Sequence, residues 1–199
     1  MVLYNDGHTE LDRPVSLTTP TVTCYQVVGL RPDFGYRCAY CLTHEFYFLQ
    51  GDGGEIDHFR PLHASGHDFS HLKNEYRNLY WTCGQCNSEK SNLWPSDADY
   101  AEGFRFLDPC IEDYDDHWAT NADGTVTART NIGRFTIRFI RLDRQRLNYL
   151  RRFLHAYQEK VAALGSELNR RDLDPQQRTA LIAHLADIKP LVAPPVFER

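Results

Sequence analysis

The first half of the chain alternates short aromatic or β-branched runs with turns, and the last third carries helical periodicity. Residues 78–82 are aromatic and β-branched, as strands prefer, and residues 55–59 follow a glycine-rich turn at 50–54. Helix-forming residues occupy 87–92 and end before Pro95. The pattern predicts a strand, a long loop, a second strand and a helix, in that order along the chain.

Apolar residues return at three- and four-residue steps in the C-terminal third, which predicts a helix from an N-cap at Asp143 to about residue 164. The periodic positions are Leu147, Leu150, Leu154, Tyr157 and Val161. Asn131 is expected to cap a shorter helix, and Asp174 and Pro175 to begin a last helix ending near Ile188. A hairpin turn is predicted at 122–126, and residues 21–28 are β-prone. Together these elements indicate an α+β fold.

Charge is distributed unevenly over the chain of 199 residues, whose formal net charge is −5. Residues 129–152 contain eight arginines and one acid, Asp143, so the segment carries +7 and the remainder −12. A basic segment on an acidic body is typical of a protein that meets a polyanion through one face. The alternative is that the arginines pair with the acidic run within 108–116. The predicted nucleic-acid contacts in this segment are Arg134, Arg138 and Arg141.

The cysteines favour metal binding over disulfides. The chain opens without the charged and apolar regions of a signal peptide, and no window reaches the roughly 20 apolar residues of a membrane span. We therefore expect a cytoplasmic, reduced protein that does not enter a membrane, in which CxxC spacing indicates a metal ligand. Cys24 and Cys110 stand outside these pairs and are expected to be small hydrophobic residues.

Two CxxC pairs form a candidate zinc site, consisting of Cys38, Cys41, Cys83 and Cys86. A two-residue gap lets one backbone turn present two sulfurs to one ion, and four thiolates close a tetrahedral site. With no open coordination position, the expected role of Zn²⁺ is structural. The 41 residues between the pairs exceed the usual spacing of a zinc ribbon, so the insertion must itself be a structured module.

The insertion contains residue types suited to cutting a phosphodiester bond. A neutral histidine such as His58 can deprotonate water near pH 7, and a hard divalent ion held by carboxylate and amide oxygens can neutralise developing charge. On a strand, Asp57 and His58 point to opposite sides, so one can hold a metal ion while the other faces the water. Glu55 shares the strand face of Asp57 and is a further candidate ligand.

This set of residues resembles the HNH family of ββα-metal nucleases. Asp57 and His58 look like the first motif of that family, and Asn78 looks like its middle asparagine. Asn87 stands where other members carry a histidine or an asparagine. The flanking CxxC pairs and the Cys-Asn-x-x-Lys ending at residues 86–90 are similar to the zinc-stapled branch of the family.

The resemblance implies a role for each matching residue. His58 would be the general base that activates water, and Asp57 and Asn87 would hold a catalytic Mg²⁺ or Mn²⁺ ion. Asn78 would hydrogen-bond the loop backbone and keep the His58 side chain in its catalytic orientation. Lys90 is expected either at a phosphate or on a solvated helix face. The loop histidines suggest another metal site by their number, although their Gly- and Ser-containing setting favours solvent exposure; they are His63, His67 and His71.

The implied fold is a small zinc-stapled ββα core with a C-terminal helical region, and the implied reaction is hydrolysis of double-stranded DNA, leaving 5′-phosphate and 3′-hydroxyl ends. We expect an N-terminal extension at 1–30, the nuclease core at 31–98, and an acidic connector with the helical region at 99–199. Weaker patterns, including residues 106–109, resemble bacterial HNH proteins that accompany ATPases in anti-phage defence, which implies a partner ATPase. The alternatives are a catalytically silent zinc-binding adaptor and an RNA-cleaving toxin with the same core.

Overall fold

The computed structural model describes residues 29–48 and 53–192, and side chains within 188–192 are not considered. The predicted β-prone run at 21–28, together with Cys24, lies outside the described residues. The fold is α+β, as predicted: it contains small antiparallel sheets and a four-cysteine cluster, and helices follow in the C-terminal region.

The predicted strand, loop, strand and helix are present. Strand β1 (Gly54–His58) pairs antiparallel with β4 (Leu79–Cys83), and Asp57 lies opposite Tyr80. Helix α4 (Gly84–Lys90) begins directly after β4, three residues earlier than predicted, so Asn87 lies within the helix and not at its start. The short helices before this unit are α2 (Leu30–Asp33) and α3 (Glu45–Phe48).

The long loop between β1 and β4 has its own structure. It contains a small hairpin, β2 (His63–Ala64) with β3 (His67–Asp68), and two 3₁₀ turns, η1 (Ser70–Leu72) and η2 (Tyr76–Asn78). Asn78 was predicted inside the second strand and instead ends η2, one residue before β4. The chain therefore passes from turn to strand at the asparagine itself.

The C-terminal half contains the predicted hairpin and helices. These elements are α5 (Asp97–Ala101), α6 (Tyr114–His117), β5 (Trp118–Thr120), β6 (Val126–Ala128), α7 (Asn131–Ile140), α8 (Gln145–Leu168) and α9 (Pro175–Val192). Thr130, not Asn131, caps α7, because its hydroxyl accepts from the Gly133 N–H at 3.1 Å. The N-cap of α8 is Arg144, one residue after the predicted Asp143. Asp174 caps α9 as predicted, accepting from the Gln177 N–H at 2.8 Å.

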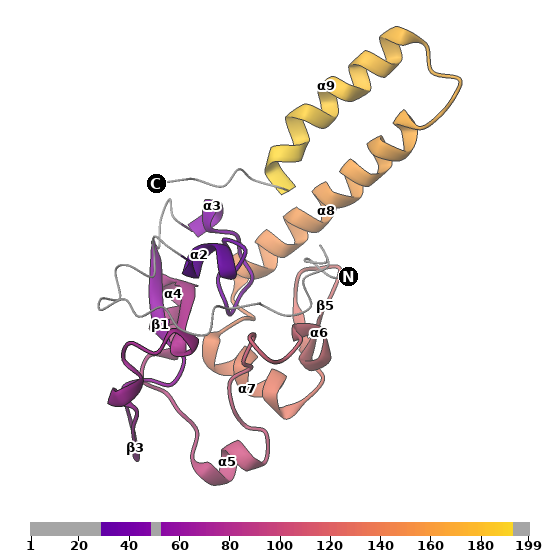
Figure 1. The fold of residues 1–199 in the computed structure, drawn as a ribbon. Helices are drawn as coiled ribbons and strands as arrows, with labels where there is room; N and C mark the ends of the chain where they lie inside the picture. The colour runs from indigo at the N-terminus through magenta and orange to yellow at the C-terminus, as the bar shows by residue number, and fades with distance from the viewer. Residues whose placement is uncertain (1–28, 49–52, 193–199) are drawn as a thin grey trace.

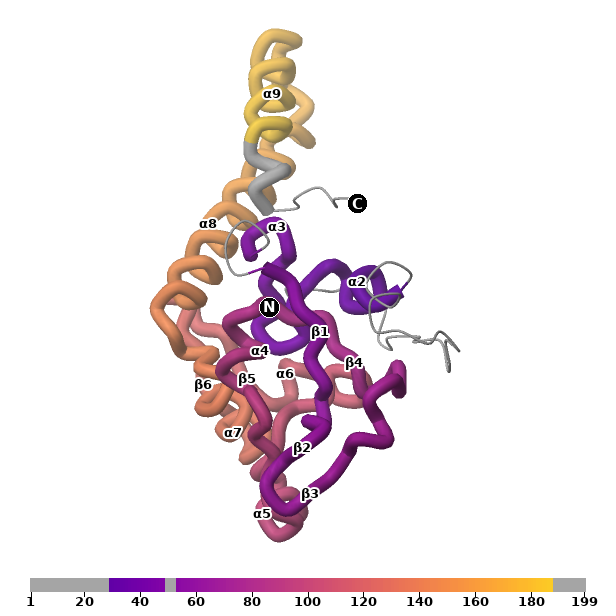
Figure 2. Tube along the Cα trace, turned by 90° about the vertical axis from the view of Figure 1, so that its left-hand side faces the viewer, coloured from indigo at the N-terminus to yellow at the C-terminus, as the bar shows by residue number. Residues whose placement is uncertain are grey.

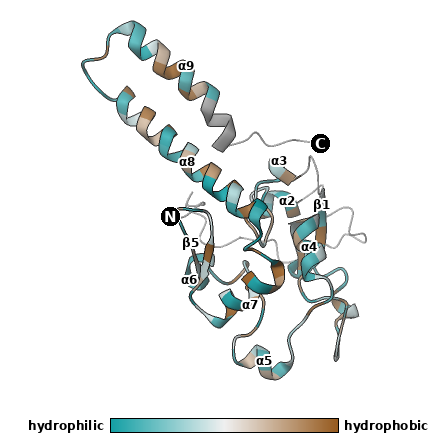
Figure 3. Cartoon of the chain, turned by 180° about the vertical axis from the view of Figure 1, so that it is seen from behind, coloured by the Kyte–Doolittle hydropathy of each residue, from teal (hydrophilic) through white to brown (hydrophobic). Residues whose placement is uncertain are grey.

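Helices α8 and α9 form an antiparallel pair that projects from the rest of the molecule (Figures 1 and 2). Hydrophobic and hydrophilic positions are interspersed along both helices (Figure 3), and Leu154 and Leu164 are buried on α8. Among the described residues, no helix combines the length and hydrophobicity needed to cross a membrane.

A single hydrophobic cluster lies beneath the ββα unit. It extends across the predicted boundary after residue 98, so the ββα unit and the following region share one core. Its members from the two sides include Leu30, Tyr40, Tyr80 and Trp81 on one, and Phe106, Leu107, Trp118, Ile140, Leu142 and Leu147 on the other. Helix α7 also packs against α4.

Candidate functional site

The two CxxC pairs meet in one buried cluster. The Sγ atoms of Cys38, Cys41, Cys83 and Cys86 all lie within 4.8 Å of one another, and those of Cys41 and Cys83 are 3.9 Å apart. Zn–S bonds of about 2.3 Å place tetrahedral sulfurs about 3.8 Å apart, so the four thiols fit Zn²⁺. The cluster is consistent with the predicted structural zinc.

Tight local backbone turns position the sulfurs. In the first pair, the Leu42 N–H donates to the Cys38 carbonyl at 3.0 Å, and Leu42 adopts a positive φ of 60°. The second pair spans the junction of β4 and α4, with Cys83 as the helix N-cap. Burial raises the pKa of the Cys38 thiol, whereas hydrogen bonds from Cys38 and its neighbours lower that of Cys41.

A cation from the C-terminal region contacts the cysteine cluster. Arg144 Nη2 donates to Cys86 Sγ at 3.1 Å, while its Nη1 donates to the Ile140 carbonyl at 2.8 Å. Arg151 also turns inward, donating to the backbone carbonyls of Gly124 and Leu142. Arg144 and Arg151 of the basic segment thus serve contacts in the interior of the protein.

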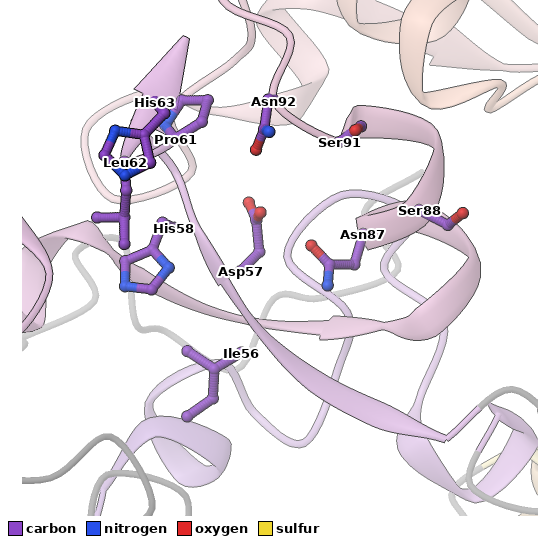
Figure 4. Close-up of a pocket in the computed structure, with 10 residues that line it drawn as sticks. All are labelled: Ile56, Asp57, His58, Pro61, Leu62, His63, Asn87, Ser88, Ser91 and Asn92. Atoms are coloured by element: carbon purple, nitrogen blue, oxygen red, sulfur yellow. The ribbon is translucent and has the colours of Figure 1, made fainter. Parts of the chain in front are cut away.

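The candidate reactive residues line an open pocket of about 490 Å³ between β1 and α4 (Figure 4). The pocket brings together Asp57, His58 and Asn87, as well as His63 and the helix end at Ser91. Asp57 and His58 both line it although they are neighbours on β1, because His58 is the last residue of the strand.

Asp57 is a buried carboxylate with two partners. Its side chain is 5% exposed, and Tyr40 donates its hydroxyl to Oδ2 at 2.5 Å. Lys90 Nζ lies 2.9 Å from Oδ1 and 2.9 Å from Oδ2. Burial raises the pKa of the Asp57 carboxyl, and Lys90 and Tyr40 oppose that rise.

The structure overturns the expectation for Lys90, which is neither at a phosphate nor on a solvated helix face. Its side chain is 0% exposed, and Nζ donates to the His58 carbonyl at 2.7 Å in addition to Asp57. Lys90 lies four residues after Cys86 on α4, so both side chains face the core. Its ammonium is therefore an internal partner of the candidate site.

His58 is held by the loop that follows it. Its Nε2 lies 2.9 Å from the Lys73 carbonyl oxygen, which can only accept, so Nε2 carries the proton. In the neutral imidazole, Nδ1 is then the unprotonated nitrogen, and Figure 4 shows it on the side of the ring toward Asp57 and Asn87. This tautomer leaves a basic nitrogen on the pocket side.

Asn78 is buried and joins the two ends of the same loop. Its Oδ1 accepts from the Arg60 N–H at 2.8 Å, and its Nδ2 donates to the Arg60 carbonyl at 3.1 Å. Nδ2 also lies 3.5 Å from the Leu72 carbonyl, next to Lys73. These are backbone contacts of the kind expected for Asn78, and its role in aiming His58 stays a prediction.

Asn87 and Glu55 face each other across β1 and α4. Asn87 Nδ2 donates to Glu55 Oε2 at 2.5 Å, and Oδ1 of Asn87 is directed toward the Asp57 side of the pocket (Figure 4). Carboxylate and amide oxygens are ligands that Mg²⁺ and Mn²⁺ accept, so Asp57 and Asn87, with Glu55 beside them, fit a hard divalent ion.

The remaining predicted residues lie outside this pocket or at its edge. Arg134, Arg138 and Arg141 are exposed on α7 and its C-cap, at four- and three-residue steps along one face. Across residues 29–48 and 53–192, the cysteines form the one cluster of three or more Cys, His, Asp or Glu ligands close enough for a metal. The loop histidines therefore do not form the second metal site that their number suggested.

Comparison with known proteins gives a distant link. No protein-family model matches the chain. The chain is similar to Septu protein PtuA of Bacillus mycoides (strain KBAB4). The identity is 28% over 139 residues, covering 59% of this chain and 19% of the Septu protein. The chain thus spans about a fifth of the length of that relative, and the match says nothing of the rest of it.

The contacts of three side chains were not foreseen from the sequence: Tyr40 on Asp57, Lys90 on Asp57 and His58, and Arg144 on Cys86. The burial of Lys90 could have been predicted from the sequence, because a residue four positions after an inward-facing metal ligand lies on the same face of a helix. Tyr40 lies between the first pair of cysteines, and Arg144 is distant in sequence, so neither had such a signal.

Proposed function

We propose that this chain is a metal-dependent endonuclease that hydrolyses DNA phosphodiester bonds with His58 as general base. The observation that carries the proposal is the 2.9 Å distance between His58 Nε2 and the Lys73 carbonyl oxygen, from which the Nε2–H tautomer is inferred. This leaves a basic Nδ1 in the pocket that also contains Asp57 and Asn87. A histidine in this state accepts a proton from water near neutral pH.

Each residue has a distinct task in the proposed reaction. Nδ1 of His58 takes the proton of the attacking water, and the Lys73 carbonyl holds the ring while the imidazolium forms. Asp57 and Asn87 would hold the divalent ion, which when bound supplies positive charge for the phosphate and the departing oxygen. Asn78 fixes the loop that carries Lys73 through its two bonds to Arg60.

The exposed arginines provide a surface for the DNA backbone. Arg134, Arg138 and Arg141 share one face of α7, and α7 packs against α4, which carries Asn87. Guanidinium groups on one face suit sequence-independent contacts to phosphates. The distant similarity to Septu protein PtuA supports a role in an anti-phage defence system. The partner ATPase is implied by the resemblance of the sequence to bacterial HNH proteins and belongs to the same proposal.

A plasmid-nicking assay tests the proposal. Zinc-loaded wild type is incubated with supercoiled DNA and Mg²⁺ or Mn²⁺ beside His58→Ala, and a structured RNA is included as a second substrate. His71→Ala is the matched control, because His71 is exposed on the same loop and does not line the pocket. We expect nicking by wild type and His71→Ala and a loss of at least about 100-fold in His58→Ala.

Three results would reject the proposal. Equal nicking by wild type and His58→Ala would show that the activity comes from elsewhere. No nicking with either metal, with or without a partner ATPase, would favour the zinc-binding adaptor, and cutting of RNA alone would favour the ribonuclease.

A further inference from the structure

Lys90 places a buried positive charge on the carboxylate that is proposed to hold the divalent ion. Its side chain is 0% exposed, and its Nζ is 2.9 Å from each carboxylate oxygen of Asp57. Because the ammonium is equally close to both oxygens, an ion bound to either one would have Lys90 as a near neighbour. Like charges at such a separation repel, so the site opposes the binding of a cation.

The ammonium of Lys90 is fixed in place. Nζ also donates to the His58 carbonyl at 2.7 Å, and the side chain leaves a helix that is anchored by Cys86. Moving the ammonium away would break its bond to the His58 carbonyl and leave a buried positive charge without partners, which is strongly unfavourable. The repulsion therefore persists when an ion enters the pocket.

The other candidate ligands add little negative charge. The charge of Asp57 is balanced by Lys90, and Asn87 contributes a neutral amide. Among the residues that line the pocket, Asp57 supplies the carboxylate, and Glu55 lies beside it with its Oε2 accepting from Asn87 Nδ2 at 2.5 Å. Mg²⁺ and Mn²⁺ in such sites commonly take their remaining anionic ligands from substrate phosphates.

We propose that Lys90 makes divalent-ion binding at Asp57 and Asn87 dependent on a phosphodiester in the pocket. This inference rests on the proposed function, and it adds that the ion and the nucleic acid bind cooperatively. Without nucleic acid the chain holds the ion weakly, so the reactive centre is completed only on the substrate. By thermodynamic linkage, the ion strengthens nucleic-acid binding by the same factor.

The first test uses the zinc-loaded full chain carrying His58→Ala, so that bound DNA stays intact. Free Mn²⁺ is measured by electron paramagnetic resonance during titration, with and without a short DNA duplex at saturating concentration. We expect the duplex to tighten Mn²⁺ binding by at least about tenfold. Equal Mn²⁺ affinity with and without the duplex would overturn the inference.

The second test removes the charge of Lys90. In the same background, Lys90→Met is expected to bind Mn²⁺ at least about tenfold more tightly without DNA, because a near unit charge repels a divalent ion even at high dielectric constant. Tyr40→Phe is the matched control, since it removes the other partner of Asp57 without changing charge. Unchanged or weaker Mn²⁺ binding by a zinc-loaded, folded Lys90→Met would overturn the inference.

The experiments can reject the nuclease proposal and the inference about Lys90 independently of each other. If Lys90→Met does not retain zinc or its circular dichroism spectrum, the comparison with and without duplex still decides the inference without this variant. Nicking by wild type that is lost in His58→Ala, together with tight and DNA-independent Mn²⁺ binding, would retain the nuclease and reject the role of Lys90. Absence of nicking would reject the nuclease itself.

Discussion

The side chain of Asn78 bonds to both sides of Arg60, accepting from its N–H at 2.8 Å and donating to its carbonyl at 3.1 Å. Arg60 lies two residues after His58, and Asn78 lies five residues after Lys73, whose carbonyl holds the His58 ring. One buried amide thus closes the loop whose Lys73 carbonyl contacts the proposed base.

Replacing Asn78 by alanine is expected to lower nicking by about tenfold or more and to destabilise the fold by about 1–3 kcal/mol, because the peptide groups of Arg60 lose their partner. Asn78→Asp keeps the acceptor for the Arg60 N–H but sets a buried carboxylate oxygen against the Arg60 carbonyl, so it should destabilise the fold at least as much as Asn78→Ala. Nicking rates and urea unfolding measure the two quantities. Full activity in a folded Asn78→Ala would show that the loop does not position His58.

Removing the guanidinium of Arg144 should loosen the cysteine cluster. Arg144 donates to Cys86 Sγ at 3.1 Å, and partners of metal ligands typically contribute about 10–100-fold to metal affinity. We expect Arg144→Ala to release zinc to a chromogenic chelator at least about tenfold faster, with Arg144→Lys between it and wild type. Arg152→Ala, on the exposed surface of α8, is the control and should match wild type. Identical release rates would mean that the contact does not stabilise the thiolates.

His44 gives the fold a defined pH dependence. Burial, and then the charge of Arg37, lower the pKa of His44 from 6.5 to about 4. In the unfolded chain His44 is protonated below about pH 6.5, whereas in the folded chain it stays neutral down to about pH 4. The free energy of unfolding therefore falls as the pH drops from about 6.5 to about 4.

Between pH 7.5 and pH 5.5 this proton uptake should reduce the free energy of unfolding by about 1 kcal/mol more in wild type than in His44→Gln. Urea titrations at both pH values, on zinc-saturated protein, measure the difference. Protonation of the cysteines affects both proteins and cancels in the comparison. Parallel losses in the two proteins would contradict the lowered pKa.

Neutralising the α7 arginines should weaken DNA binding by an electrostatic route. The triple change of Arg134, Arg138 and Arg141 to alanine is expected to reduce affinity for a short duplex and lower the slope of log K against log salt by about three. Fluorescence anisotropy at several salt concentrations measures the slope. The control replaces three exposed basic residues of the projecting α8–α9 pair and its connection, Lys160, Arg171 and Arg178, by alanine, and it should leave the slope unchanged. Equal slopes for both triples would place the DNA elsewhere.

Local patterns explain what could be predicted from the sequence. The cysteine pairs and the order β1, β4, α4 follow from short-range spacing and turns, and these predictions are confirmed. Helix starts were less accurate, because Thr130 and Arg144 take the cap positions assigned to their neighbours. The predicted catalytic roles remain predictions.

Long-range contacts explain what could not be predicted. The charge count treated every arginine of residues 129–152 as available to a polyanion, yet Arg144 and Arg151 turn toward the interior. The location of Lys90 was predicted from a sequence motif, without considering that Lys90 lies on the same buried face of α4 as Cys86. Composition gives the number of charges, whereas tertiary packing decides which of them reach solvent.

The hydrophobic cluster that crosses residue 98 limits how this protein can be divided. A fragment ending there would expose the faces that Phe106, Trp118 and Ile140 cover in the intact chain. The smallest piece that keeps the cluster whole runs from Leu30 to Leu147, and it also retains the Arg144 contact to Cys86. Gene fusions that transplant this unit into another protein should therefore include the β5–β6 hairpin and α7. The part of the α8–α9 pair that follows Leu147 can be changed or removed.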